Sequence, residues 1–358
     1  MLHENTINHL LTINEIYHEP NVHEYKRGRE ILLKYPTAQL IEVASHNQIP
    51  KLFGFQGSVE DWIWNKKNVL ILGTKKALQA RPNTRSAHWV APSQSNGCTM
   101  SCSYCYVPRR KGYANPITTF INIEQIMGYL SRHAGKQGIK KIPDAIDKKY
   151  WVYEIGENGD CSADAAICDN VKDLICLYVT LPNAKLTFAT KFVNHDMLNY
   201  APQQKTRIRF SLMPHQISKL VDVRTSPISD RIAVMNEFRK AGYEVNVSFA
   251  PVIYYEGWLL DWRKLFVEMN EVLDDETKKQ LVTEIIFLTH NELLHDVNML
   301  WHPKGEEVLW NPEIQQVKYS ESGQRNVRYK NNLKSELVNE LVSLCKELIP
   351  YCTIRYAF

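Results

Sequence analysis

Strand-like and helix-like segments alternate through the middle of this 358-residue chain, and this alternation restricts the fold more than any other feature. Short runs rich in Val, Ile, Phe and Tyr are typical of buried strands, and the stretches between them are long enough for helices. Expected strands lie at 148–155, 185–190, 206–212, 244–254 and 281–288, and expected helices at 164–180, 192–201, 227–241 and 258–274. Such an order predicts an α/β protein of parallel βαβ units, in a barrel or a doubly wound sheet. The pattern alone leaves that choice open.

The two ends of the chain follow other patterns. A helix at 22–35 followed by strands at 38–44 and 67–72 predicts a small N-terminal α/β unit. Residues 302–330 are polar and indicate an irregular stretch, before an amphipathic helix at 331–348 and a closing strand. We therefore expect three parts, namely an N-terminal α/β domain at 1–85, a central βαβ domain at 86–300 and a C-terminal helix–strand extension at 301–358.

Composition narrows the class of protein without choosing its partner. Hydrophobic residues make up 44% of the chain and charged residues 23%, which excludes a disordered or fibrous chain. The 43 basic and 39 acidic residues nearly balance, so net charge neither requires nor excludes nucleic acid. The first residues lack the pattern of a signal peptide, and no apolar run reaches the ~18 residues of a membrane span. We expect a cytoplasmic protein without a membrane partner.

Three of the eight cysteines lie close together in the segment SNGCTMSCSYCY. Cys98, Cys102 and Cys105 have the spacing C-x3-C-x2-C, and eight cysteines are too few for a disulfide scaffold. Three thiolates can hold three irons of a cubic iron–sulfur cluster and leave the fourth iron open, whereas electron-transfer clusters commonly use four cysteines. The alternatives are a zinc site completed by His88 or His133, and three unrelated buried cysteines. The compact spacing favours the iron–sulfur cluster.

This spacing resembles the signature of the radical S-adenosylmethionine (radical SAM) superfamily. The resemblance implies a partial TIM-like (β/α)6 barrel, with the cysteine loop after a first strand at 86–93. It also implies a 4Fe-4S cluster whose open iron binds S-adenosylmethionine. One electron, from a donor such as flavodoxin or ferredoxin, then splits this cofactor into methionine and a 5′-deoxyadenosyl radical.

Within that superfamily the chain resembles the spore photoproduct lyase family over almost its whole length. The segments that carry the resemblance occur in the family's order: SHNQIP (45–50), VLILGTKKAL (69–78), SAHWVAPSQSNGC (86–98), CSYCY (102–106), TKF (190–192), RIRFS (207–211), TSPISDRI (225–232), AGYEV (241–245), APVIYYEGW (250–258) and IRYAF (354–358). The implied activity is repair of UV-damaged DNA. The radical abstracts a hydrogen from a methylene-bridged thymine dimer, the bridge breaks, and a cysteine thiol returns a hydrogen atom.

The resemblance also implies roles for residues near the reaction. Cys161, in GDCSAD, occupies the position of the hydrogen-donor cysteine, although a free cysteine is often only a small buried hydrophobe. Tyr104 and Tyr106 match two tyrosines that relay the radical back to the cofactor, although they can equally pack the cysteine loop. Ser162, Lys191 and Ser211 follow successive strands and are the implied S-adenosylmethionine contacts.

Two basic segments are candidates for contact with nucleic acid. One contains Arg109, Arg110 and Lys111, and the other, where the family has a hairpin near the lesion, contains Arg325, Arg328 and Tyr329. Without the resemblance, an ordinary solvated surface is the better interpretation of such runs.

Two departures from the family pattern fall near the expected substrate. The hairpin reads GQRNVRYK instead of Gly-Arg-Tyr, and charged residues Glu157 and Asp160 precede the donor cysteine. The alternatives to photoproduct repair are therefore a radical SAM enzyme acting on another nucleic acid, a peptide or a small molecule, and a non-catalytic, zinc-stabilised nucleic-acid-binding protein.

Overall fold

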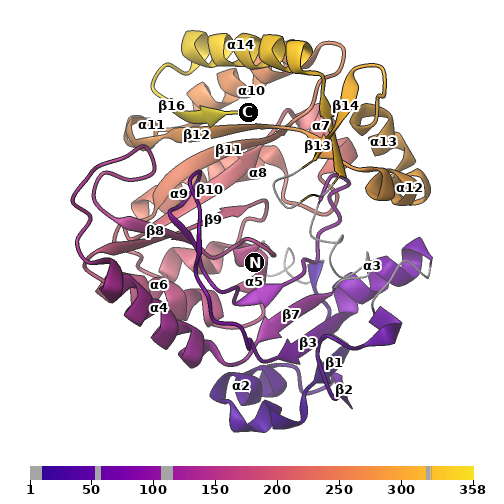
Figure 1. Ribbon diagram of the computed structural model, residues 1–358, viewed down its shortest axis with the longest axis vertical. Coiled ribbons are helices and arrows are strands. Elements are labelled where there is room, and N and C mark those ends of the chain that lie inside the picture. The colour runs from indigo at the N-terminus through magenta and orange to yellow at the C-terminus, as the bar shows by residue number, and fades with distance from the viewer. Residues whose placement is uncertain (1–9, 53–57, 106–115, 320–322, 324) are drawn as a thin grey trace. The chain divides into compact units, whose positions relative to one another are not determined.

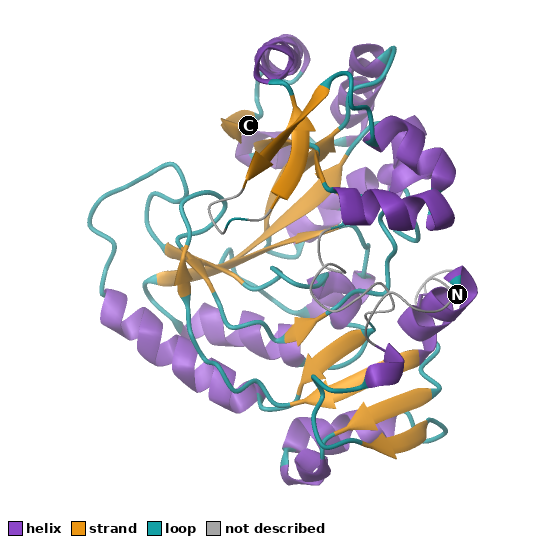
Figure 2. Cartoon of the chain, turned by 45° about the vertical axis from the view of Figure 1, so that its right-hand side comes forward, coloured by secondary structure: helices purple, strands orange, loops and turns teal. Residues whose placement is uncertain are grey.

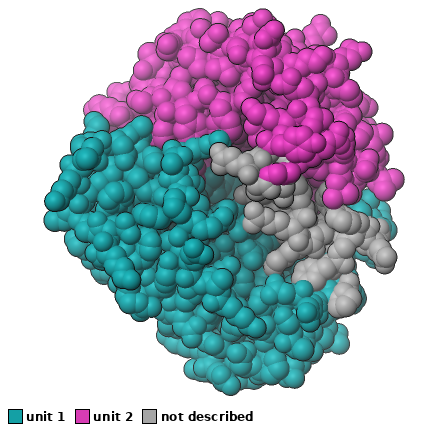
Figure 3. Space-filling model, viewed as in Figure 1, with its two compact units in different colours: residues 1–100, 106–208, 241–244 teal, residues 101–105, 209–240, 245–358 magenta. Residues whose placement is uncertain are grey.

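The computed structural model describes residues 10–52, 58–105, 116–319, 323 and 325–358. The chain forms two compact units (Figure 3): unit 1 comprises residues 1–100, 106–208 and 241–244, and unit 2 comprises residues 101–105, 209–240 and 245–358. Because these units follow other boundaries, the three-part division after residues 85 and 300 stays a prediction. Within the described ranges, no helix has the length and apolar character needed to cross a membrane.

A five-stranded sheet forms the N-terminal part of unit 1 (Figure 1). Its order is β2-β1-β3-β7-β6, with β1 (Glu15–His18), β2 (Gln39–Glu42), β3 (Val69–Gly73), β6 (Ser95–Asn96) and β7 (Ile117–Phe120). All neighbouring pairs are parallel except β6 with β7. Strand β3 is buried throughout, as expected of a parallel strand covered on both faces. The sheet therefore takes in two strands that lie beyond residue 85.

Helices and one buried carboxylate fasten the connections of this sheet. The helices are η1 (Pro20–Glu24), α2 (Lys26–Lys34), η2 (Pro50–Leu52) and α3 (Val59–Asn68). A capping box between Ser58 and Asp61 begins α3. Glu19, at the carboxyl end of β1, accepts hydrogen bonds from the backbone N–H of His46 and of Thr74, both at 3.2 Å. Doubly wound sheets usually bind ligands at this edge, and here the protein's own carboxylate occupies it.

The second sheet has eight strands in the order β16-β12-β11-β10-β9-β8-β5-β4 (Figures 1 and 2). Their bounds are β4 (Arg81–Pro82), β5 (Trp89–Val90), β8 (Trp151–Glu154), β9 (Ala184–Thr190), β10 (Thr206–Leu212), β11 (Glu244–Val252), β12 (Val282–Phe287) and β16 (Thr353–Ala357). The six strands from β5 to β12 are neighbours in chain order. β5 pairs parallel with β8, β8 with β9, β11 with β12, and β12 with β16. The expected partial (β/α)6 barrel is confirmed.

The barrel helices bury the faces of these strands. They are α4 (Ile123–Gln137), α5 (Cys161–Asp164), α6 (Asn170–Thr180), η4 (His195–Asn199), α7 (His215–Val221), α8 (Ile228–Ala233), α9 (Met235–Lys240), α10 (Trp258–Val272) and α11 (Asp275–Gln280). Strand β10 is buried at every position, although Arg207 and Arg209 alternate with its apolar residues, because both arginines are paired with carboxylates. Phe249 of β11 packs edge to face on Trp262 of α10, with ring centroids 5.2 Å apart.

The expectation that residues 302–330 are irregular is wrong. The segment contains α13 (Pro303–Leu309) and the strands β14 (Gln315–Tyr319) and β15 (Arg325–Tyr329), which pair antiparallel. β13 (Thr289–His290) joins them in the order β13-β15-β14. In the sequence, α12 (Glu292–Trp301) lies between β13 and α13, and α14 (Asn331–Leu348) follows β15. β14 buries only its first residue, so the apolar alternation that predicts a strand is too weak to detect.

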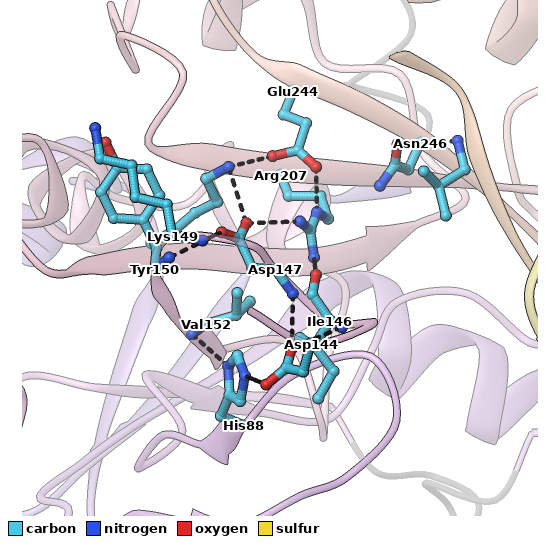
Figure 4. A network of polar contacts seen from close by, with 12 residues as sticks. His88, Asp144, Ile146, Asp147, Lys149, Tyr150, Val152, Arg207, Glu244 and Asn246 are labelled. Carbon is cyan, nitrogen blue, oxygen red and sulfur yellow. Dashed lines mark hydrogen bonds and ion pairs between the residues drawn. The ribbon is translucent and has the colours of Figure 1, made fainter. Parts of the chain in front are cut away.

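Four charged side chains form a network at the N-terminal ends of the barrel strands in unit 1 (Figure 4). Asp147 lies 3.2 Å from Lys185 Nζ and 3.0 Å from Arg207 Nη2. Glu244 pairs with the same two cations. Burial alone would raise the pKa of Asp147, but Lys185, Arg207 and nearby backbone N–H groups outweigh it and leave this pKa lowered. This end of a barrel generally serves stability, whereas the opposite end carries the chemistry.

We predict that Arg207→Met lowers the free energy of unfolding by about 3 kcal/mol, because it leaves two largely buried carboxylates short of a cation. Urea unfolding of the full chain at pH 7 measures the change. Lys148→Met removes an exposed positive charge from the same loop and is the matched control, expected within about 0.5 kcal/mol of the parent. Equal losses in the two variants would contradict a specific role of the network.

Candidate active site

Cys161 begins a single turn of helix, α5, shortly after strand β8 ends. Its side chain is fully buried. A Cβ on Gly156 would lie only 3.3 Å from Cys161 Sγ and 3.2 Å from Glu154 Oε1. The glycine therefore allows the thiol and this carboxylate to lie against the same backbone turn.

The carboxylate of Asp160 holds this turn to the end of the next strand. It caps α5 by accepting from the N–H of Ser162 at 3.0 Å and of Ala163 at 3.2 Å. It also accepts from Thr190 Oγ1 and from the Lys191 N–H, each at 2.8 Å. Burial raises the pKa of Asp160, although these four hydrogen bonds oppose the rise. One carboxylate thus brings Cys161, Ser162 and Lys191 to the carboxyl ends of β8 and β9.

The predicted cofactor contacts divide between the two units. In unit 1, the hydroxyl of Ser162 is buried and has no hydrogen-bond partner among the described residues, which suits a polar ligand. Lys191, which directly follows β9, is half-buried. In unit 2, Ser211 is buried near the end of β10, and its carbonyl oxygen accepts a hydrogen bond from Arg231 at 2.8 Å.

The chain that leads into the cysteine loop is fastened to the thiol-bearing turn by Asp164. This carboxylate accepts hydrogen bonds from Gln94 Nε2 at 2.5 Å and from Ser95 Oγ. A backbone bond of 2.9 Å from the Gly97 N–H to the Asn158 carbonyl adds to it. Residues 94–97 and 158–164 therefore form one hydrogen-bonded block within unit 1.

The three clustered cysteines have half-exposed side chains, and none of the chain's eight cysteines is in a disulfide. The Met100 N–H lies 3.4 Å from Cys98 Sγ and donates to it, a bond commonly made to metal-bound thiolates. In unit 2, the Cys105 N–H donates to the Cys102 carbonyl at 3.0 Å and forms a tight turn. This donor set fits an iron–sulfur cluster held by three thiolates. Among the described residues, no three or more His, Cys, Asp or Glu side chains lie close enough together to hold a metal ion.

Both histidines that could complete a zinc site have other partners. His88 uses its two ring nitrogens, one with Asp144 at 2.9 Å and the other with the Val152 N–H at 2.9 Å. Burial, the largest effect, lowers the pKa of His88 against the pull of Asp144. His133 Nδ1 lies 2.8 Å from the hydroxyl of Tyr153. These bonds disfavour the zinc alternative.

Tyr104 is anchored inside unit 2. Its hydroxyl donates a hydrogen bond to Asp222, which forms a fully buried ion pair with Arg231 at 3.1 Å. Burial and the neighbouring Asp222 carboxylate raise the pKa of Tyr104 well above its usual value. The phenol therefore keeps its proton. The backbone N–H groups of Ser101 and Ser103 bond to the carbonyls of residues 223 and 221.

Only one of the two basic segments falls within the described residues. Arg109, Arg110 and Lys111 lie outside them, as does Tyr106, the second tyrosine predicted to relay the radical. Arg325 is exposed and pairs with Glu292, and Arg328 is half-buried on the same strand. Tyr329 is buried, and its hydroxyl accepts from the Tyr254 N–H at 2.8 Å, so its ring supports the hairpin from within.

The family model described as spore photoproduct lyase matches residues 11–358. The chain belongs to the spore photoproduct lyase family. It is therefore also a member of the radical SAM superfamily.

Curated members of the spore photoproduct lyase family match along nearly the whole chain. The enzyme of Bacillus subtilis (strain 168) is 26% identical over 344 residues, covering 95% of this chain and 97% of that protein. The enzyme of Geobacillus sp. (strain Y412MC61) is 23% identical over 345 residues, with coverages of 95% and 97%. A solved structure titled spore photoproduct lyase complexed with dinucleoside spore photoproduct has a TM-score of 0.86 at 21% identity, covering 97% of this chain and 99% of that chain. That similarity establishes the fold.

No sequence pattern of this spore photoproduct lyase family member marks the buried charges that support its site. Asp164, Asp222 and Arg231 were assigned no role, although each lies in or beside a segment quoted for the resemblance. Asp and Arg are almost never fully buried unless they are paired. Sequence alone does not reveal burial, so these residues could be found only once the fold was known.

We predict that Asp164 makes the free energy of unfolding fall as the pH rises, the opposite of the effect of an ordinary paired aspartate. Burial is the main cause that raises the pKa of Asp164 to about 7, against the hydrogen bond from Ser95. Between roughly pH 4 and pH 7 the unfolded carboxyl is ionised while the folded one keeps its proton, so the free energy of unfolding falls as pH rises. Across this window the parent should lose up to about 4 kcal/mol relative to Asp164→Asn, which cannot titrate.

Urea unfolding of both proteins at several pH values between 4.5 and 8 tests this expectation. Asp196→Asn, which changes an exposed aspartate, is the control and should follow the parent. If the free energies of the parent and Asp164→Asn run parallel across the window, the raised pKa of Asp164 is wrong.

Proposed function

We propose that this chain is the radical SAM lyase that splits the spore photoproduct in UV-damaged DNA. The observation that carries the proposal is a family match that spans residues 11–358, including the three cysteines and Cys161. The buried thiol at the carboxyl end of the second barrel strand supports it, because barrel enzymes do their chemistry at that end.

The cofactors follow from the same match. One solved relative is titled as a mutant spore photoproduct lyase with bound AdoMet and dinucleoside spore photoproduct, and we extend both ligands to this chain. Cys98, Cys102 and Cys105 would hold a 4Fe-4S cluster, and Ser162, Lys191 and Ser211 would contact S-adenosylmethionine. When bound, the cluster and this cofactor supply a carbon-centred radical that can abstract hydrogen from the substrate.

Cys161 serves as the hydrogen donor in this proposal. Its S–H bond is weaker than the C–H bond formed when a product carbon radical takes its hydrogen atom, so the transfer is downhill. Burial keeps the thiol away from water and from dissolved oxidants, and the Asp160 cap fixes the turn that carries it.

Tyr104 and Tyr106 would carry the radical away from Cys161 after that transfer. The hydrogen bond from Tyr104 to Asp222 supports an ordered, protonated phenol, which is the form that can give up a hydrogen atom. The same bond also supports a purely structural role, in which Tyr104 anchors the cysteine segment.

DNA contact would fall to the two basic segments. Arg325 and Arg328 lie on β15, and Arg109, Arg110 and Lys111 follow the cysteine loop in the sequence. A cytoplasmic location and a flavodoxin or ferredoxin as the electron donor belong to the same proposal. One observation favours the alternative in which the radical chemistry is kept and the substrate is different. Arg325 lies in the hairpin, whose sequence differs from the family pattern, and it is paired with Glu292.

Anaerobic reconstitution followed by an assay with the dinucleoside spore photoproduct tests the function. We expect about four irons per chain, release of 5′-deoxyadenosine after reduction, and recovery of thymine. A protein that releases 5′-deoxyadenosine but leaves the photoproduct intact would favour the other-substrate alternative. A colourless protein that binds zinc would overturn the enzyme assignment.

We predict that Cys161→Ala keeps S-adenosylmethionine cleavage but lowers the yield of intact thymine at least tenfold, because the product radical loses its hydrogen donor. Chromatography of the products, with 5′-deoxyadenosine measured in parallel, gives both quantities. Cys168→Ala changes another buried cysteine, which packs in the N-terminal hydrophobic core, and is the matched control. Clean thymine recovery by Cys161→Ala would show that another group donates the hydrogen.

A further inference from the structure

A buried carboxylate in unit 2 collects donors from three separate positions. Glu306 of α13 is 1% exposed. Its Oε1 lies 2.7 Å from His290 Nε2 and 2.6 Å from His295 Nδ1, and its Oε2 lies 2.7 Å from Asn298 Nδ2. Both contacts are hydrogen-bonding distances between a histidine ring nitrogen and the same carboxyl oxygen.

On one side, this carboxylate reaches the cysteine segment. The side-chain amide of Asn298 also donates to the Ser103 carbonyl at 2.6 Å, and Asn298 itself is fully buried. Ser103 lies between Cys102 and Cys105 in the sequence, and its N–H bonds to the residue 221 carbonyl at 3.0 Å. A Cβ on Gly305 would lie 3.4 Å from Ser103 Oγ, so α13 packs directly against this segment.

On the other side, the carboxylate reaches the hairpin. His290 belongs to β13, where it pairs with Val327 of β15, and its neighbour Thr289 pairs with Arg328. His290 is fully buried, so its ring has little room to move without its strand. A shift of β15 therefore displaces the donor that His290 gives to Glu306.

We propose that Asn298 and Glu306 are positioning residues that couple the hairpin β14–β15 to the cysteine segment 101–105, so that nucleic acid bound at the hairpin changes the order of that segment. The coupling rests on the proposed function, since it takes the photoproduct as the hairpin's ligand. Its physical basis is the cost of leaving a buried carboxylate or amide short of a partner, which makes the members of such a network move together.

The network has little spare bonding capacity. Asn298 Oδ1 and His290 Nδ1 are buried and have no hydrogen-bond partner among the described residues. Once Glu306 moves, the His290 ring therefore has no other hydrogen bond within the described structure, and the Asn298 side chain keeps only its bond to the Ser103 carbonyl. The link runs within one unit, from β15 through His290, Glu306 and Asn298 to Ser103.

Hydrogen exchange with mass spectrometry on the reconstituted full chain, without reductant, tests the coupling independently of turnover. The probe is the dinucleoside spore photoproduct, and undamaged thymidylyl-thymidine is the control ligand. In the parent, we expect the photoproduct to slow exchange both in β15 and at the amides of Ser101 and Ser103. In Asn298→Leu, free exchange of the latter amides should rise about tenfold, and the photoproduct should protect only β15.

Glu306→Gln keeps the side-chain size, should give the same loss of coupling, and replaces Asn298→Leu if that variant does not fold. Glu307→Gln changes the adjacent, exposed glutamate and should behave as the parent. Protection of Ser101 and Ser103 in Asn298→Leu equal to that in the parent would overturn the coupling. So would a parent in which β15 is protected and the cysteine segment is not. Absence of photoproduct binding to the parent would instead overturn the proposed substrate, and the coupling with it.

Discussion

The Asp160 carboxylate is the interaction on which the candidate site depends. It is buried, yet four donors satisfy it: two backbone groups of α5, the hydroxyl of Thr190 at the end of β9, and the N–H of Lys191, which follows β9. A turn of only four helical residues has no stability of its own, because helix nucleation is unfavourable. The hydrogen bonds of Asp160 to α5 and to the end of β9 therefore hold the backbone of Cys161 in place, which a longer helix would otherwise do.

Buried polar groups also fasten the surroundings of the cysteines. In unit 1, Asp164 holds residues 94 and 95 ahead of Cys98. In unit 2, the Asp222–Arg231 pair holds Tyr104, and Asn298 holds the Ser103 carbonyl. A buried polar group costs free energy when it loses its partner, so these hydrogen bonds favour one conformation of each segment more strongly than apolar packing would.

The sequence predicted the regular parts of the fold well and the supporting charges poorly. The helix at 331–348 and the strand at 206–212 have the bounds that periodicity indicated, because apolar residues recur at helical spacing in the first and at every second position in the second. Periodicity did not reveal the hairpin strands, because β14 is mostly exposed and its apolar alternation is weak; only the family resemblance placed a hairpin there. The cysteine spacing and the quoted segments identified the family, now shown by the family match. Positions such as Asp164 and Asn298 could not be recognised, since their importance arises from burial and from partners far away in the sequence.

Arg231 shows how little freedom such an arrangement leaves. Its guanidinium is fully buried and bonds to the Ser211 and Ser226 carbonyls, to Asp222 and to Thr225. A lysine carries one compact ammonium in place of a planar fork of five N–H groups, so it cannot reach all of these acceptors from the same place. Residues 211–226 are thus held around a single cation. Even a lysine at position 231 would weaken two parts of the structure together: the end of β10 at Ser211, and the Asp222 carboxylate that holds Tyr104.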